Sequence, residues 1–203
     1  MIAAIIDIVA SRDVNARERR KLDTKIRNLL VQTHRRFSEY CAAIPALTQG
    51  DSIELLVSSW QPLVFLFHRV LMEDLAFRVG LGTGEIIIHK ENADECDGPA
   101  FWNAREALDE IKHMKYMNRL AGFNFDEVTS DNEKNAVINS ILFLTTLHGL
   151  STTQLKQCFY YIWEKKNISE IAQAVKTSKG NVSKTLSKTP CYLLGKVMIF
   201  LNQ

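Results

Sequence analysis

The chain has 203 residues, of which 46% are hydrophobic and 24% charged, a composition typical of a globular protein with one large and one small domain. Its formal net charge of +2 is unevenly distributed: residues 1–150 carry 17 Lys and Arg against 21 Asp and Glu, and residues 151–203 carry 8 Lys against 2 Glu. A basic module after a mildly acidic one favours an anionic partner, most commonly nucleic acid, although a solvated lysine-rich face has the same composition.

The first two thirds of the chain alternate between apolar runs typical of strands and amphipathic stretches typical of helices. We predict, in chain order, a strand at 3–9, a helix at 13–41, strands at 44–48 and 52–57 around the turn 49–51, a helix at 61–74, a strand or glycine-broken strand pair at 77–88, a helix at 99–115 and a possible last strand at 120–125. This order is that of the ferredoxin-like, or split βαβ, arrangement, which underlies palm-type nucleotide domains.

The C-terminal quarter reads as short helices at 151–164, 168–175 and 179–188, with Thr152 or Thr153 capping the first and Asn167 or Ser169 the second. Ala172 supplies the small residue that two crossing helices require. The polar face of the third helix holds cations and hydrogen-bonding groups, with no acid. Its members are Lys179, Asn181, Ser183, Lys184, Ser187 and Lys188. Insertion into the DNA major groove needs this composition, since lysines contact phosphates and Asn or Ser contact base edges.

The stretch STTQLKQCFYYIWEKKNISEIAQAVKTSKGNVSKTL resembles region four of bacterial sigma factors and the LuxR-type domains. The resemblance implies a helix-turn-helix that binds duplex DNA. The sequence departs from the family pattern at Lys176, where the turn usually carries glycine. Three small helices that pack without touching DNA are the alternative interpretation.

Two aspartates form the most specific polar feature of the acidic part. Asp7 lies within the first apolar strand and Asp51 lies at a hairpin tip, and a ferredoxin-like layout places these two elements side by side. Paired carboxylates with a backbone carbonyl, such as that of Ile8, suit Mg²⁺, and phosphoryl transfer uses a metal held in this way. Equally, Asp7 would satisfy a neighbouring backbone group, and Asp51 would be an ordinary turn residue.

The segments IIDIVASR, GDSIELLV, RVGLGTGEIII and GPAFWNAREAL resemble, in order, motifs of the class III nucleotide cyclases. The resemblance implies that Asp7 and Asp51 bind the metal and that Asn103 positions a nucleotide sugar. Where that family has a transition-state arginine this chain has Ala107; Arg105 is the nearest cation, about 160° away around a helix. We therefore predict nucleotide binding at Asn103 and Arg105 and leave catalysis open.

The glycines at 80, 82 and 84 allow two interpretations, a phosphate cradle or a strand bulge. The DIVASR start, the QGDS hairpin and DGPAFWNAREAL also make the whole chain similar to the SatD family of bacterial proteins. That resemblance implies the two-part architecture rather than an activity.

The remaining features exclude several other classes of protein. The four cysteines (Cys41, Cys96, Cys158 and Cys191) are far apart, so we expect small core residues and neither a zinc site nor a disulfide scaffold. Residues 1–8 lack the features of a signal peptide, and the apolar runs are shorter than the roughly 20 residues that span a bilayer. We therefore expect a cytoplasmic protein without a membrane partner. The apolar stretch 192–201 predicts a core or dimer helix.

The sequence thus predicts an α+β chain, with a cyclase-like palm domain at 1–128, a linker helix at 129–150 and an all-α helix-turn-helix domain at 151–203. The first functional hypothesis is a homodimeric DNA-binding regulator whose N-terminal domain senses a nucleotide or mediates dimerisation. A Mg²⁺-dependent nucleotide cyclase or transferase is the second, and we favour it less. The third is a protein–protein adaptor that never touches DNA.

Overall fold

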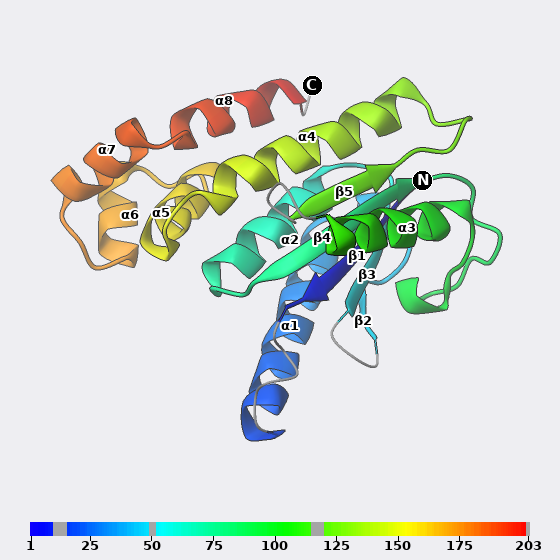
Figure 1. Cartoon of the computed structure of the whole chain (residues 1–203). Coiled ribbons are helices and arrows are strands. Elements are labelled where there is room, and N and C mark those ends of the chain that lie inside the picture. Colours follow the sequence, from blue (N-terminus) through cyan, green and yellow to red (C-terminus); the bar gives the residue numbers. More distant parts are fainter. Residues whose placement is uncertain (10–15, 49–51, 115–119, 202–203) are drawn as a thin grey trace.

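The computed structural model describes residues 1–9, 16–48, 52–114 and 120–201, and within them the chain is an α+β protein (Figure 1). Its N-terminal part contains β1 (Ile2–Ile8), α1 (Ala16–Arg36), β2 (Ala46–Leu47), β3 (Ser52–Val57), α2 (Gln61–Met72), β4 (Phe77–Thr83), α3 (Pro99–His113) and β5 (Ala121–Asn124). Five helices follow: α4 (Asp131–His148), α5 (Thr152–Ile162), α6 (Ile168–Ala174), α7 (Lys179–Lys188) and α8 (Cys191–Leu201).

The five strands form one mixed sheet in the order β2-β3-β1-β4-β5. β1 lies antiparallel to both β3 and β4, whereas β5 lies parallel to β4. The apolar residues of β1 alternate between two cores, since side chains along a strand point to opposite faces. Ile2, Ala4 and Ile6 belong to the core shared with α1 and α2, and Ala3 and Ile5 belong to the core under α3.

Two glycines allow α3 to lie directly on β4. A Cβ on Gly80 would lie 2.0 Å from the Ala104 carbonyl oxygen, and one on Gly82 would lie 2.2 Å from the backbone of Ala100 and Ala104. The strand ends at Thr83, not at residue 88 as the apolar run predicts. Gly84 follows with a φ of +151°, and the chain leaves the sheet there.

The C-terminal helices share the core of α1 and α2 instead of standing apart from it (Figure 1). Val137 and Leu144 of α4 are fully buried in this core, as is Cys158 of α5. At the end of α1, the Arg36 guanidinium donates to the Trp163 carbonyl oxygen at 2.7 Å and pairs with Glu164 at 3.1 Å. Helices α4 to α8, which we call the helical module, are therefore fixed to the face of the sheet opposite α3.

Two sequence expectations for this module are wrong. Cys158 of α5 and Cys191 of α8 form a disulfide, with their Cα atoms 5.3 Å apart, because α8 packs back against α5 and brings together residues 33 positions apart. The cap of α5 is Ser151, not Thr152 or Thr153, and it forms a reciprocal capping box with Gln154.

Candidate functional site

Helix α7 begins with a defined cap and buries a narrow apolar stripe. The Ser178 hydroxyl accepts a hydrogen bond from the Asn181 backbone N–H at 3.1 Å, which satisfies one of the free donors of the first turn. Val182 and Leu186 are fully buried, one turn apart on the inner face, where they join Ile171 of α6 in the core. The apolar spacing of the sequence thus decides which side of α7 faces outward.

The outward side of α7 is polar and cationic throughout. All six residues predicted from the sequence as DNA contacts are exposed: Lys179, Asn181, Ser183, Lys184, Ser187 and Lys188. Within the described part of the chain, none of the three lysines pairs with a carboxylate. The Asn181 amide donates to the Thr177 hydroxyl at 2.9 Å, so it is held near the start of the helix.

The turn between α6 and α7 has the backbone geometry of a glycine position. Lys176 has a φ of +53°, in the left-handed region that side chains disfavour. The next residue, Thr177, donates its backbone N–H to the Ala172 carbonyl oxygen at 2.9 Å, which closes the end of α6. At the other end of α6, the Asn167 side chain accepts from the N–H groups of Ser169 and Glu170. The turn is therefore tight although it contains lysine.

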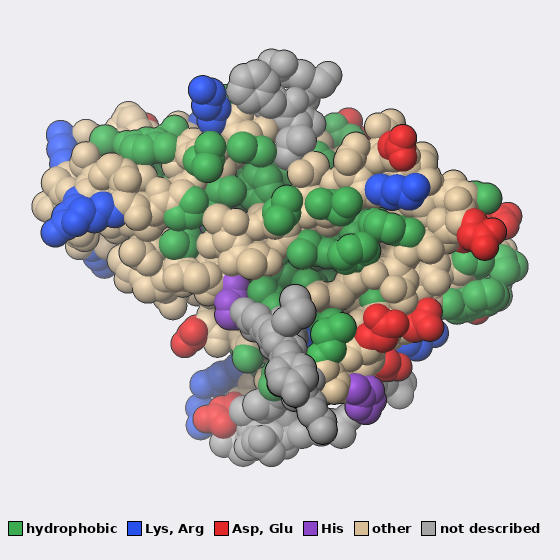
Figure 2. All heavy atoms as spheres, turned by 45° about the horizontal axis from the view of Figure 1, so that its top comes forward, with side chains coloured by type: hydrophobic (Ala, Val, Ile, Leu, Met, Phe, Trp, Pro, Cys, Tyr) green, Lys and Arg blue, Asp and Glu red, His purple; other side chains and the backbone are tan. Residues whose placement is uncertain are grey.

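Figure 2 shows Lys and Arg side chains at the α6–α7 end of the molecule, a mixture of acidic and basic side chains at the opposite end, and hydrophobic side chains between them.

Two of the three predicted metal residues, Asp7 and Ile8, lie at one end of the sheet. Asp7 is half-buried near the end of β1, on the α3 side, opposite Ser52 in β3 and Arg78 in β4. The Arg78 guanidinium lies 4.0 Å from its carboxylate. Ile8 is the last residue of the strand, and Asp51 lies outside the described residues.

Of the two predicted nucleotide residues, Asn103 is not beside Asp7. The Asn103 amide donates to the Thr83 carbonyl oxygen at 2.8 Å. Thr83 faces Ile2 at the opposite end of β1, five residues from Asp7, or about 17 Å along a strand. Arg105 is exposed on α3 and acts electrostatically on Glu54 of β3. The structure therefore separates Asn103 from Asp7 within one chain.

Glu54 of β3 is the carboxylate on which the charges of Arg105, Asp94 and Asp97 act. Burial of its half-buried side chain raises its pKa, the Arg105 charge opposes that rise, and Asp94 and Asp97 add to it. Across the described residues, no group of three or more His, Cys, Asp and Glu side chains is arranged to hold a metal ion.

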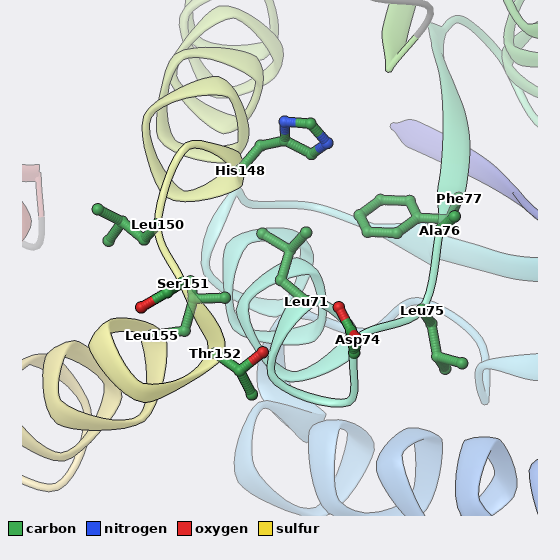
Figure 3. Close-up of a pocket in the computed structure, with 10 residues that line it drawn as sticks. All are labelled: Leu71, Asp74, Leu75, Ala76, Phe77, His148, Leu150, Ser151, Thr152 and Leu155. Carbon is green, nitrogen blue, oxygen red and sulfur yellow. The ribbon is translucent and has the colours of Figure 1, made fainter.

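A cavity of about 380 Å³ lies where the N-terminal part meets the helical module (Figure 3). Its polar lining comes from Asp74, after α2, and from His148, Ser151 and Thr152 at the α4–α5 junction. Leu71, Leu75, Phe77 and Leu155 provide apolar walls. None of the residues predicted from the sequence as site residues lines this cavity.

Sequence reasoning missed Arg78 and Glu54. Strand alternation places Glu54 on the same face as Ser52 and Arg78 on the same face as Gly80, but it does not say that this is the face of Asp7. Their proximity to the predicted residues depends on the register between strands, which a single sequence does not display.

The fold defines an α+β protein with a five-stranded mixed sheet and a C-terminal helical module fixed to one face of that sheet. Residues 1–194 match the model of the SatD family, and the chain belongs to this family. Comparisons with curated proteins and with solved structures gave no significant match. In the described residues, no helix combines the length and the apolar character that crossing a membrane requires.

Proposed function

We propose that the protein binds duplex DNA by inserting α7 into the major groove, in the manner of a transcriptional regulator. The observation that carries the proposal is the division of α7 into a buried Val182–Leu186 stripe and an exposed face with three unpaired lysines and no acid. Lysines on such a face neutralise phosphates, and Asn181, Ser183 and Ser187 offer hydrogen bonds to base edges.

The arrangement of α6 and α7 supports a helix-turn-helix. Ile171 and Val182 pack together in the core between the two helices, and the left-handed Lys176 turns the chain between them. In this motif the second helix contacts base edges in the DNA major groove, and the first helix crosses the DNA phosphate backbone. Lys176, which is also exposed, would therefore add a phosphate contact.

For the N-terminal domain we propose a regulatory role, by nucleotide sensing or by dimerisation. The strand order β2-β3-β1-β4 with antiparallel pairs supports the cyclase-like palm. Helix-turn-helix proteins usually engage paired half-sites, which favours a homodimer. Mg²⁺ binding at Asp7, Ile8 and Asp51 and nucleotide binding at Asn103 and Arg105 remain part of this proposal, although Asn103 lies at the opposite end of β1 from Asp7.

The test is fluorescence anisotropy of a labelled duplex at several salt concentrations, with the wild type and a Lys179→Ala/Lys184→Ala variant. A matched control, Lys21→Ala/Lys90→Ala, removes two exposed lysines from the N-terminal part. We expect wild-type affinity to fall steeply with salt, because bound lysines release counterions. The α7 variant should bind at least about tenfold more weakly and show a smaller salt slope by about two.

Two results would overturn the proposal. One is the absence of duplex binding at low salt. The other is equal weakening by the α7 variant and the control, which would mean non-specific attraction. Affinity for a protein partner that does not change with salt would instead support the adaptor hypothesis.

A further inference from the structure

A second pocket lies in the helical module, on the side formed by α5 and α8, and has a volume of about 430 Å³. Cavities that hold small ligands in proteins are typically about 300–1,000 Å³. Its lining, which we call the lysine–tyrosine pocket, consists of Tyr161, Lys165, Lys166, Tyr192, Gly195, Lys196 and Ile199. No residue predicted from the sequence as a site residue belongs to it.

Two tyrosines and a glycine shape the apolar part of the pocket. The rings of Tyr161 and Tyr192 meet edge to face, with centroids 5.1 Å apart and planes at 87°. Gly195 lies under Tyr161, where a Cβ would come within 2.8 Å of the Tyr161 ring atom Cε1. An aromatic surface walled in this way suits a planar ring, because offset and edge-to-face contacts are favourable.

Three lysines surround the aromatic surface. Lys165 and Lys196 are exposed, and Lys166 is half-buried with its Nζ 4.4 Å from the centre of the Tyr160 ring. None of the three pairs with a carboxylate among the residues that the structure describes. Glu164, the acid next to them in sequence, is directed away from the pocket to Arg36. No carboxylate of the described residues therefore balances the positive charge of the pocket.

The backbone holds one of these lysines in a disfavoured conformation. Lys165 has a φ of +52°, which costs on the order of 1 kcal/mol for a residue with a side chain. Lys166, next to it, donates its backbone N–H to the Tyr160 carbonyl oxygen at 3.1 Å. The end of α5 thus turns so that consecutive lysines reach the mouth of the pocket.

We propose that the lysine–tyrosine pocket binds a free nucleotide, with the base against Tyr161 and Tyr192 and the phosphates on Lys165, Lys166 and Lys196. An inorganic anion would use the lysines but not the aromatic walls. Duplex DNA would offer phosphates, but its bases are already stacked and paired. A phosphorylated aromatic molecule uses both halves of the lining.

This inference rests on the proposed DNA binding by α7 and goes beyond it, because it adds to the helical module a nucleotide site of its own, distinct from the role proposed for the N-terminal domain. The pocket contains the end of α5 just before α6, and also α8 just after α7. A ligand joining these elements would hold both flanks of the α6–α7 pair. Binding of the nucleotide would then fix the position of α7 and so change its affinity for DNA.

The experiment measures binding of N-methylanthraniloyl-ATP and N-methylanthraniloyl-GTP to the full chain, by anisotropy. The pocket variants are Lys165→Ala/Lys196→Ala and Tyr192→Ala, each checked for folding by circular dichroism. Lys179→Ala/Lys184→Ala is the matched control, since it removes the same charge from the same module. We expect at least one probe to bind saturably, the pocket variants to bind at least about tenfold more weakly, and the control to bind like the wild type.

Inorganic tripolyphosphate should displace the probe much less well than the unlabelled nucleotide, because it cannot use the tyrosines. The proposal is overturned by a lack of saturable binding at millimolar probe, by equal weakening in pocket and control variants, or by equal displacement with tripolyphosphate. Duplex binding is measured separately on the same samples. Loss of duplex binding in the α7 variant alone tests the proposed function, whereas loss of nucleotide binding in the pocket variants tests this inference. Failure of one proposal can therefore be told from failure of the other.

Discussion

Trp163, just after α5, donates a hydrogen bond from its Nε1 to the Nδ1 of His68 in α2, at 3.2 Å. The other ring nitrogen of His68 lies 2.9 Å from the Leu155 carbonyl oxygen, which can only accept. His68 is therefore neutral, with its proton on Nε2. Both side chains are buried, so this pair ties the N-terminal part to the helical module through the core.

The His68 pair predicts acid-sensitive stability. Burial, the largest cause, lowers the pKa of His68 from 6.5 to about 4. Between these values the unfolded chain binds more protons than the folded one, so the free energy of unfolding falls as the pH falls from 6.5 to about 4, by roughly 3 kcal/mol in total. Above pH 6.5 this group makes no pH-dependent contribution.

The measurement is urea unfolding at a series of pH values for wild type, His68→Gln and a control, His113→Gln, which changes an exposed histidine. We expect the stability of His68→Gln to depend less on pH in this window, and the control to follow the wild type. Parallel pH profiles for wild type and His68→Gln would show that His68 does not titrate as described.

The Cys158–Cys191 disulfide predicts sensitivity of the helical module to reductant. Closing a chain segment of 33 residues stabilises the fold by up to about 4 kcal/mol through the entropy of the unfolded chain. A reductant should therefore lower the melting temperature of the wild type. Cys158→Ala/Cys191→Ala should melt at a lower temperature with no further response, whereas Cys41→Ala/Cys96→Ala should keep the response. An unchanged melting temperature under reduction would contradict a stabilising bond.

Gly80→Ala should strongly destabilise the protein, because the new Cβ would lie 2.0 Å from the Ala104 carbonyl oxygen and α3 would have to move. We expect a loss of about 3 kcal/mol or more. Gly180→Ala is the control: its Cβ would meet no described atom closer than the Ser178 hydroxyl at 4.0 Å. There the higher helix propensity of alanine should add up to about 1 kcal/mol. Chemical denaturation of both variants measures the difference in the free energy of unfolding. Similar stabilities would mean that α3 moves away from β4 at little energetic cost.

Asp7→Ala should leave duplex binding within about twofold of the wild type. Asp7 faces α3, whereas the helical module lies on the opposite face of the sheet, against α2. Anisotropy with the duplex used for the α7 variants measures this directly. A Mg²⁺-dependent shift in melting temperature that is present in the wild type and absent from Asp7→Ala would support the metal proposal. Strongly weakened duplex binding in Asp7→Ala would show that the sheet edge and α7 are coupled.

The sequence alone was enough to predict several of the elements closely and the outward face of α7. The residues of α7 were predicted at both ends, because Ser178 caps the helix and the Val182–Leu186 spacing leaves only one apolar stripe. The strands β1 and β3 also lie within a residue of their predicted ranges, since runs of branched apolar residues between polar turns leave little alternative. The match to the SatD family agrees with the predicted resemblance.

Only the tertiary structure decided which distant residues meet. Strand register places Asp7 opposite Arg78 and far from Asn103, and helix packing joins Cys158 to Cys191 and His68 to Trp163. It also shows that Gly80 and Gly82 serve the close approach of α3. Local propensity acts over a few neighbouring residues, whereas these contacts depend on the relative positions of whole elements, which the buried core sets collectively.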